Sequence, residues 1–433
     1  AVDRILLHRV AGPFIFTSIM LGLFASVFWL AKFPMEWIQA GVDALKGVAA
    51  PALVQYPMLQ SLIADGVIAG VGAFLVFLPQ ILILFFFIGI LEDSGYMARA
   101  AFIMDRLFSW CGLNGKSFVP LLSGFACAIP GLLSTRTIED PKARLATAFA
   151  VPFMSCSARF PVYALMCAAF IGPLYGPGWE SIVMVGMHVI GLLFAVPTAF
   201  VLTRFVLRIR PQPFVLELPR YQLPKPRDVL WRMWQNAAEF ISKAGTVIFA
   251  ITIIVWALCY FPQNTQLADK IRAENPTLSA NEVQLRAQAA GIEQSWMGRF
   301  GKAVQPIFDP CGFDWKITVG VLASFPAREV IVSTLGITYS IGQDAEADSQ
   351  DLRQAMQHAK WTEGKRVGKP IFSLAAVLAL MVFFALCSQC GPTIATLAQE
   401  SGGWKWAAAS FFYMTFLAWV MAVMVYQVVI RLT

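Results

Sequence analysis

The sequence predicts an all-α polytopic membrane protein, and three observations lead to that prediction. Hydrophobic residues make up 58% of the 433 positions and charged residues only 14%, whereas soluble domains are roughly half apolar and a quarter charged. Seven apolar stretches are long enough to cross a bilayer as helices. Some of them hold prolines, hydroxyls, thiols and an arginine, which lipid cannot satisfy, so these parts must face protein or a wet cavity.

The expected spans are joined mostly by short connections. A basic arm with Arg4, His8 and Arg9 comes first and places the N-terminus in the cytoplasm. Lys32–Gly66 mixes acidic residues with lysines and suits an external loop. The seven spans are residues 12–31, 67–91, 145–172, 181–203, 245–261, 370–397 and 407–430.

Prolines and glycines interrupt several apolar stretches. We interpret Ser117–Thr135 and Ile317–Ile341 as hairpins that enter the membrane and return. Two spans are themselves broken, one within Ala150–Leu165 and the other at Cys387–Pro392. Discontinuous helices of this kind form the binding sites of many secondary transporters.

The two halves of the chain echo each other at an offset of 200 residues. Phe108–Phe125 and Phe308–Phe325 share seven of eighteen residues in that alignment. Farther along, the Cys-Ser pair at Cys156 matches the pair at Cys387. The common order of these matches predicts an internal repeat. If neither hairpin crosses, each repeat has three crossings and the second copy is inverted.

This pattern predicts four regions. Residues 1–66 form the arm, first span and external loop, and residues 67–204 form the first repeat. Residues 205–244 are a basic, proline-rich cytoplasmic connector that ends in an amphipathic helix at Asp228–Lys243. Residues 245–433 form the second repeat, with a soluble insertion at 263–309. In that insertion, Ser279–Glu282 is a capping box and Gly291 is the expected end of its helix.

Thiols and hydroxyls lie at both breaks, and they are the first candidates for a metal path. Thiolates and thioethers are soft ligands, while carboxylates and carbonyls suit harder divalent ions. A carrier must release its ion, so a mixed and incomplete set of ligands fits transport. The alternative is that these cysteines are small apolar fillers of a core. The sulfur and hydroxyl candidates are Met154, Ser155, Cys156, Ser157, Cys127, Cys387 and Cys390.

Charged residues within or beside the apolar stretches are the second set of candidates. Glu329 is an intramembrane acid and therefore a functional candidate, although an ion pair with Arg328 is an equal alternative. Glu92 and Asp93 end the second span and suit a cavity mouth or a solvated helix end. Arg159 either pairs with one of these acids or repels cations.

Other features exclude some functions. Gly112–Ser117 resembles a phosphate loop, but Trp110 stands where its first glycine is needed, which excludes nucleotide binding there. The three histidines, His8, His188 and His358, are scattered and fit structural roles. The net charge of +7 fits loops that face an anionic leaflet, not nucleic acid.

Five stretches are similar to one known family. They are LEDSGYMARAAFIMDRL (91–107), GKSFVPLLSGFACAIPGLLSTRTIEDP (115–141), PFMSCSARFPVYAL (152–165), FPAREVIVSTLG (325–336) and GGWKWAAASFFYMTFLAWVMAVMVYQ (402–427). They resemble the membrane domain of FeoB, the bacterial ferrous-iron transporter family, and the arm at Asp3–His8 resembles the segment that joins that domain to its soluble part.

The resemblance implies two gate repeats of the kind also found in nucleoside carriers. It also implies iron-path groups at Cys127, Ser155, Cys156, Ser157, Glu329, Cys387 and Cys390. Two features depart from the family. Cys387–Thr393 is an altered version of its cysteine-rich segment, and the sequence has no GxxxxGK[ST] for the usual N-terminal G-protein domain.

Together these features predict a non-enzymatic carrier of Fe²⁺ across the bacterial inner membrane, along a Cys, Ser and Glu path between the gate repeats. The resemblance implies that Fe²⁺ is the transported ion and that GTP acts only through a missing or separate G domain. The expected partners are lipid, that G domain or GTPase chain, a small FeoA-like protein and further copies of the chain. The alternatives are an ion-coupled carrier of a nucleoside-like solute, which needs Asn, Gln and Glu at the hairpin tips, and a redox or scaffold protein with a Cys387–Cys390 disulfide.

Overall fold

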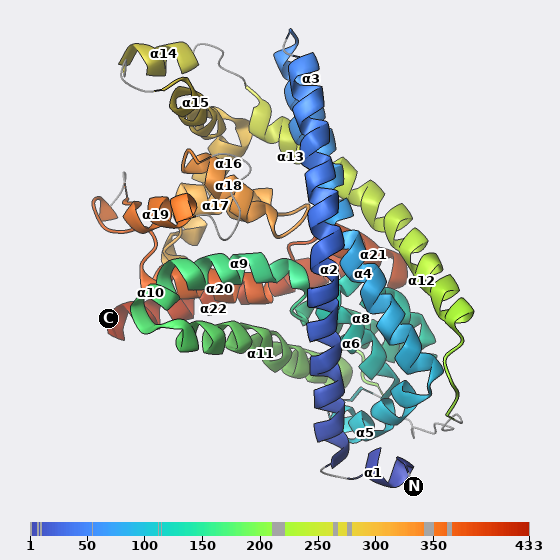
Figure 1. Cartoon of the computed structure of the whole chain (residues 1–433). Coiled ribbons are helices and arrows are strands. Elements are labelled where there is room, and N and C mark those ends of the chain that lie inside the picture. Colours follow the sequence, from blue (N-terminus) through green and yellow to red (C-terminus); the bar gives the residue numbers. More distant parts are fainter. Residues whose placement is uncertain are drawn as a thin grey trace. The chain divides into compact units, whose positions relative to one another are not determined.

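The computed structural model describes residues 2–6, 8, 11–53, 55–110, 112–113, 115–209, 221–262, 267–274, 279–341, 350–361 and 366–432. Within these ranges the regular structure is helical, apart from one β-bridge between Lys360 and Pro370. Figure 1 shows the helices in chain order.

The described helices up to the basic connector are α1 (Val2–Leu6), α2 (Ala11–Ala52), α3 (Pro57–Ser61), α4 (Ala69–Asp93), α5 (Tyr96–Trp110), α6 (Phe118–Ala126), α7 (Ala128–Ser134), α8 (Pro141–Ala150), α9 (Phe160–Met166), α10 (Gly172–Tyr175) and α11 (Pro177–Val201). Those after it are α12 (Pro226–Phe240), α13 (Thr246–Tyr260), α14 (Leu267–Glu274), α15 (Ala280–Gln294), α16 (Trp296–Phe308), α17 (Trp315–Ala323), α18 (Val330–Thr338), α19 (Gln350–His358), α20 (Leu374–Leu386), α21 (Gly391–Glu400) and α22 (Trp404–Leu432).

Seven described helical segments are long and apolar enough to cross a membrane, and they correspond to the seven expected spans. They are Ala11–Ala52, Pro57–Asp93, Pro141–Tyr175, Pro177–Val206, Pro226–Tyr260, Leu374–Glu400 and Trp404–Leu432. The predicted class, an all-α multi-pass membrane protein, is confirmed.

Both predicted hairpins are present. In the first, α6 and α7 pack against each other, and Cys127 between them is extended, with φ −153° and ψ 134°. In the second, α17 and α18 pack together around a turn at Ser324–Glu329. Each helix has only seven to nine residues, which is too short to cross a bilayer.

Both predicted breaks are present as well. The first broken span leaves α-helical geometry after α8 and passes through two short 3₁₀ turns before α9. The second broken span is non-helical from Cys387 to Cys390, between α20 and α21. Proline explains the first interruption, because Pro152 and Pro161 cannot donate the backbone hydrogen bonds of a continuous helix.

The chain divides into two compact units, which are interleaved along the sequence. Unit 1 holds residues 1–156, 193–250 and 392–407, and unit 2 holds residues 157–192, 251–391 and 408–433. Two of the dividing points fall at or beside the helix breaks, after Cys156 and after Gly391. Each broken span therefore gives one of its halves to each unit.

The expected loop at Lys32–Gly66 is wrong for most of its length, because α2 continues to Ala52 as a single helix of 42 residues and helical structure resumes at Pro57. Figure 1 shows it without interruption. The segment from Lys32 to Ala52 holds five alanines, the residue with the highest helix propensity, and Lys32 lies 3.8 Å from Glu36 one turn later. The scattered charges belong to an exposed helix surface.

Two smaller expectations also differ from the structure. The amphipathic helix is not separate from the next span, because α12 passes into α13 through a π-helical turn at Ile241–Gly245. The capping box at Ser279 is confirmed, with reciprocal hydrogen bonds to Glu282, but α15 runs past Gly291 and ends at Gln294. Three of the connector's prolines, at 211, 213 and 219, lie outside the described residues.

Arg136 links three segments of unit 1. It follows the first hairpin, and its Nε and Nη2 donate to both carboxylate oxygens of Glu400 at the end of α21, at 2.9 and 2.5 Å. Its Nη1 also donates to Glu239 of α12, which accepts from Lys243 at 2.6 Å. The Glu400 side chain is only 7% exposed while the Arg136 side chain is 49% exposed, so the carboxylate of this bidentate pair is shielded from water and the guanidinium is partly solvated.

We therefore expect Arg136→Gln to lower the free energy of unfolding by roughly 1–3 kcal/mol, because it leaves a buried carboxylate without its charged donor. Thermal unfolding of the purified protein in detergent measures this. Lys32→Gln is the control, since the Lys32–Glu36 side chains are 71% and 59% exposed and their pair should contribute little. Equal shifts for both variants would contradict the assignment.

Candidate functional site

Unit 1 places its hairpin directly against the first helix break. Both α6 and α7 contact the 3₁₀ turn Val151–Phe153. Close approach is possible because glycines stand at the interface: a Cβ on Gly124 would lie 3.2 Å from Met154 Cγ, and one on Gly131 would lie 2.8 Å from the Pro120 carbonyl oxygen. The glycines that suggested an interrupted hairpin therefore also allow it to pack.

The sulfur and hydroxyl candidates of unit 1 differ in accessibility. Met154 and Ser155 are buried, at 1% and 3% exposure, and Cys156 beside them is half-buried. Cys127 is half-buried at the tip of the hairpin and packs against a core cluster that includes Phe74 and Phe240. The two thiols are thus partly exposed, whereas the thioether is enclosed.

Unit 2 repeats this arrangement with the second hairpin and the second break. The Ser324 hydroxyl donates to Gln389 Oε1 at 3.2 Å, and the Gly391 N–H donates to the Phe325 carbonyl at 3.0 Å. Cys387 is fully buried, while Cys390 is half-buried. The Cys387 thiol donates to the Phe384 carbonyl oxygen at 3.8 Å.

Two arginines also bind the second break. Arg328 Nη2 donates to the Cys387 carbonyl oxygen at 3.1 Å, and its Nε donates to the Gln389 carbonyl oxygen at 3.2 Å. Arg159 Nη2 donates to the same Cys387 oxygen at 3.4 Å. Both arginines are buried, and α9, which follows Arg159, packs beside α20 (Figure 1).

The remaining acidic and hydroxyl candidates divide between the two units. Glu329 is half-buried at the tip of the second hairpin, and its Oε2 is buried without a hydrogen-bond partner in the part of the chain described. Ser157 is half-buried at the start of the 3₁₀ turn that contains Arg159. In unit 1, Asp93 accepts from Arg232 at 2.9 Å, and exposed Glu92 lies 3.8 Å from the same guanidinium.

The candidate ligands do not form a preassembled metal centre. In the described ranges, no three His, Cys, Asp or Glu side chains cluster as a resident metal ion would require. Each unit instead combines a break, its backbone carbonyls and one or two thiols with a hairpin. Such an arrangement suits brief contact with a passing ion better than permanent binding.

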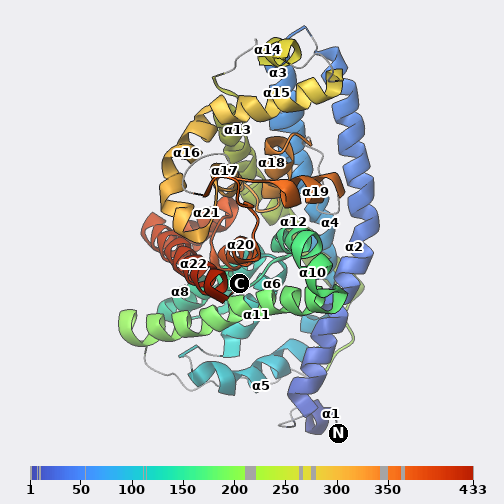
Figure 2. The same ribbon diagram turned by 90° about the vertical axis from the view of Figure 1, so that its left-hand side faces the viewer.

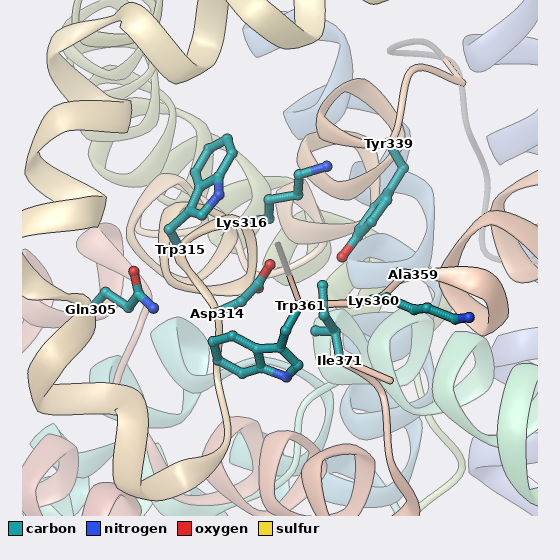
Figure 3. Close-up of a pocket in the computed structure, with 9 residues that line it drawn as sticks. All are labelled: Gln305, Asp314, Trp315, Lys316, Tyr339, Ala359, Lys360, Trp361 and Ile371. Atoms are coloured by element: carbon teal, nitrogen blue, oxygen red, sulfur yellow. The ribbon is translucent and has the colours of Figure 1, made fainter. Parts of the chain in front are cut away.

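Unit 2 also contains a pocket that the sequence did not predict. It has a volume of about 200 Å³. Figure 3 shows the Asp314 carboxylate and the Tyr339 hydroxyl pointing toward its middle, while the Lys360 ammonium group points away. The Tyr339 hydroxyl has no hydrogen-bond partner in the described residues, and Lys316 Nζ donates to the Thr338 carbonyl at 3.0 Å.

Asp314 has two roles in this pocket. It caps α17, because its Oδ1 accepts the Ile317 N–H at 2.8 Å, and it is 4% exposed. Burial raises the pKa of its carboxyl from 3.8 to about 6, although the Ile317 N–H and the Lys316 charge act in the opposite direction. Asp314 lies outside the seven candidate spans.

Sequence reasoning missed the partners of the two arginines. It expected Arg159 to pair with an acid or repel cations, and it did not single out Gln389 or Ser324. Gln389 lies inside the Cys387–Cys390 motif, so its position at the break could have been a signal. Nothing in the sequence indicated that Arg159 and Arg328, 169 positions apart, share one carbonyl oxygen.

Comparison with known proteins agrees with this architecture. A family model described as nucleoside recognition (Gate) matches residues 74–170 and 241–404, and a model described as ferrous iron transport protein B C terminus matches residues 184–236. No solved structure matches the chain significantly.

Curated relatives match almost the whole chain. A Porphyromonas gingivalis Fe(2+) transport protein A/Fe(2+) transporter FeoB fusion protein is 39% identical over 99% of this chain and 51% of its own length. The Fe(2+) transporter FeoB of Leptospira biflexa is 39% identical over 98% and 59%, respectively. That of Campylobacter jejuni is 34% identical over 97% and 64%. The chain thus spans about half to two thirds of the length of these relatives.

The two hairpins and two broken spans define a membrane protein of the gate type. The chain belongs to the Gate family and, within it, to the FeoB proteins, whose membrane part it matches. The family predicted from the sequence motifs is therefore confirmed.

We expect Gly131→Ala to destabilise the first hairpin by roughly 1–3 kcal/mol, because the new Cβ meets backbone atoms that cannot move aside. Thermal unfolding in detergent measures the effect. Gly186→Ala in α11 is the control, since its Cβ would have no heavy atom within 4 Å. A Gly131 variant as stable as the Gly186 variant would rule out the close approach.

The pH dependence of stability should reflect Asp314. Its folded pKa of about 6 exceeds its ordinary value of 3.8, so the folded state holds the extra proton between these values and loses stability as pH rises through them. Asp314→Asn keeps a capping side chain but cannot titrate. Between about pH 4 and pH 7 the melting temperature of the wild type should fall more than that of the variant. Parallel pH profiles would contradict this.

Proposed function

We propose that this chain carries Fe²⁺ across the bacterial inner membrane. The observation that carries the proposal is the repeated site: each unit sets a helix break with a serine and a cysteine, Ser155–Cys156 in unit 1 and Cys387–Ser388 in unit 2, against a glycine- or proline-interrupted hairpin. The relatives named Fe(2+) transporter FeoB, which match nearly all of this chain, support Fe²⁺ as the ion.

The chemistry of the site supports a transported ion in preference to a resident one. Fe²⁺ accepts both soft sulfur and harder oxygen ligands. Cys156 and Cys387 would supply sulfur, with Cys127 and Cys390 as further thiols and Ser155, Ser157 and Glu329 as oxygen donors. Met154 is nearly enclosed and would act only after a local rearrangement. Among the described residues, neither break lies in a cluster of three His, Cys, Asp or Glu side chains, which favours release of the ion.

The gating residues have distinct proposed roles. Asp93 and Glu92, paired with Arg232, would mark a mouth of the path. Arg159 and Arg328 would control the second break. The path would run between the two gate repeats, with the second repeat inverted, the N-terminus in the cytoplasm and the 205–244 connector on the same side.

The energy source would lie in a partner and not in this chain. We propose a non-enzymatic transporter driven or regulated by a cytoplasmic G-protein domain or a separate GTPase chain, which alone would bind GTP. The Porphyromonas relative is a fusion with an Fe(2+) transport protein A, which supports a small FeoA-like partner. Lipid and further copies of the chain would complete the assembly.

A second candidate is a carrier of a nucleoside-like solute. The Gate model is described as nucleoside recognition, and Gln389 and Glu329 provide an amide and a carboxyl group at the second hairpin and break. The thiols at equivalent positions of both breaks favour the metal ion. Competition of Fe²⁺ uptake by nucleosides would favour the second candidate.

Fe²⁺ uptake into proteoliposomes tests the proposal directly. Under reducing conditions, with the GTPase partner added, we expect Cys156→Ala and Cys387→Ala each to lower the uptake rate by roughly tenfold, the loss of one good ligand contact. Cys259→Ala in α13 is the matched control, because this cysteine packs against a separate cluster that includes Val319 and Met297.

The outcomes separate the alternatives. Uptake unchanged in both cysteine variants would remove these thiols from the path. A disulfide between Cys387 and Cys390 in the purified protein, together with no uptake, would support the redox or scaffold protein. Anomalous scattering from crystals soaked in Fe²⁺ or Mn²⁺ should place a peak near a break.

A further inference from the structure

The break after α20 exposes backbone carbonyls inside the protein. The last turn of any helix has carbonyl oxygens without helical partners, and the non-helical residues Cys387–Cys390 add more. Each oxygen that stays buried and unsatisfied costs roughly 1–3 kcal/mol, so something must bind them.

Two guanidinium groups bind these oxygens in the structure. Arg328 spans two carbonyls, with Nη2 at 3.1 Å from the Cys387 oxygen and Nε at 3.2 Å from the Gln389 oxygen. Arg159, which is far from Cys387 in the sequence, also donates to the Cys387 carbonyl oxygen, at 3.4 Å. Arg159 is 0% exposed and Arg328 is 4% exposed, so water does not compete for these contacts.

The same oxygens are the natural ligands for a cation. In carriers with discontinuous helices, unwound carbonyls and helix C-termini hold the transported cation. The C-terminal end of α20 also carries the negative end of the helix dipole, which attracts positive charge. An incoming ion and the two arginines would therefore compete for one set of oxygen atoms.

We propose that Arg159 and Arg328 act as tethered cations that keep the second break closed, and that they must leave the Cys387 and Gln389 carbonyls before a metal ion can bind there. This inference rests on the proposed function, transport of a cation. It assigns to the two arginines the control of metal-ion access to these carbonyl oxygens. The fully buried Cys387 thiol becomes available in the same step.

Arginine suits this role better than lysine. Its planar fork bridges two carbonyls that belong to one unwound segment, as Arg328 does here. Its charge persists at every physiological pH. Two such charges beside one oxygen also repel a divalent ion. In the closed state the arginines therefore prevent passive ion flux in two ways, because they occupy the carbonyl oxygens and because they repel the cation.

The test compares variants that keep the hydrogen-bonding capacity but differ in charge. Arg159→Gln/Arg328→Gln retains amide donors without charge, and Arg159→Lys/Arg328→Lys retains charge without the fork. Arg431→Gln, on the exposed end of α22, is the matched control. Each is reconstituted without nucleotide or GTPase, and passive Fe²⁺ and Mn²⁺ flux is measured beside iodoacetamide labelling of Cys387, read by peptide mass spectrometry.

We expect the double glutamine variant to raise passive flux and Cys387 labelling by roughly tenfold, the scale of one lost repulsion between nearby charges. The lysine variant, which keeps the charge but not the fork, should give a flux between those of the wild type and the glutamine variant, and Arg431→Gln should change neither readout. Wild-type flux and protected Cys387 in the double glutamine variant, with a lowered melting temperature, would overturn the inference and leave the arginines as structural caps.

Two further results keep the outcome clear. If the double variant does not fold, Arg328→Gln alone removes two of the three described carbonyl contacts and must raise Cys387 labelling above the wild type; unchanged labelling overturns the inference. If the wild type never transports Fe²⁺ but labelling and Mn²⁺ flux rise as expected in the glutamine variants, the inference stands and the proposed ion is wrong.

Discussion

The structure depends on one constraint: the backbone groups that its broken helices leave unpaired must be satisfied inside the protein. Proline removes donors at Pro152 and Pro161, and the second break leaves the Cys387 and Gln389 carbonyls outside any helix. Each hairpin packs against one break and covers its unpaired backbone groups. Side chains and backbone of Ser324, Phe325 and Arg328 bind the second break, and α6 and α7 cover the first.

The two breaks also mark where the chain passes between its compact units. The division falls after Cys156 in one broken span and after Gly391 in the other. A position that lacks helical hydrogen bonds bends more easily than one inside a helix. The residues with candidate ligands are thus the residues at which the chain can flex, so ion contact and movement would share the same few positions.

The stability of the second break comes from polar contacts that an ion would have to replace. Three described hydrogen bonds from two buried arginines end on two carbonyl oxygens. In unit 1, by contrast, the bidentate Arg136–Glu400 pair lies outside the break and ties the end of α21 to the segment after the hairpin. Arg159 and Arg328 thus occupy a candidate ion site, whereas Arg136 stabilises the packing of unit 1 away from the break.

The sequence by itself determined the class, the seven spans, both hairpins and both breaks, because apolar length, prolines and glycines act locally on the backbone. The sequence-based prediction was wrong at Lys32–Ala52, where helix-forming residues favour a helix despite the scattered charges. It was also wrong at Gly245, where a π-helical turn joins α12 to α13 without a break. Only the tertiary structure decided what the polar residues bind. Arg159 and Arg328 both donate to the Cys387 carbonyl oxygen, and Asp314 and Tyr339 line one pocket. Packing brings these distant segments together, and no local sequence pattern encodes such contacts. Figure 2 gives a second view of the helices concerned, α17, α18 and α20 of unit 2.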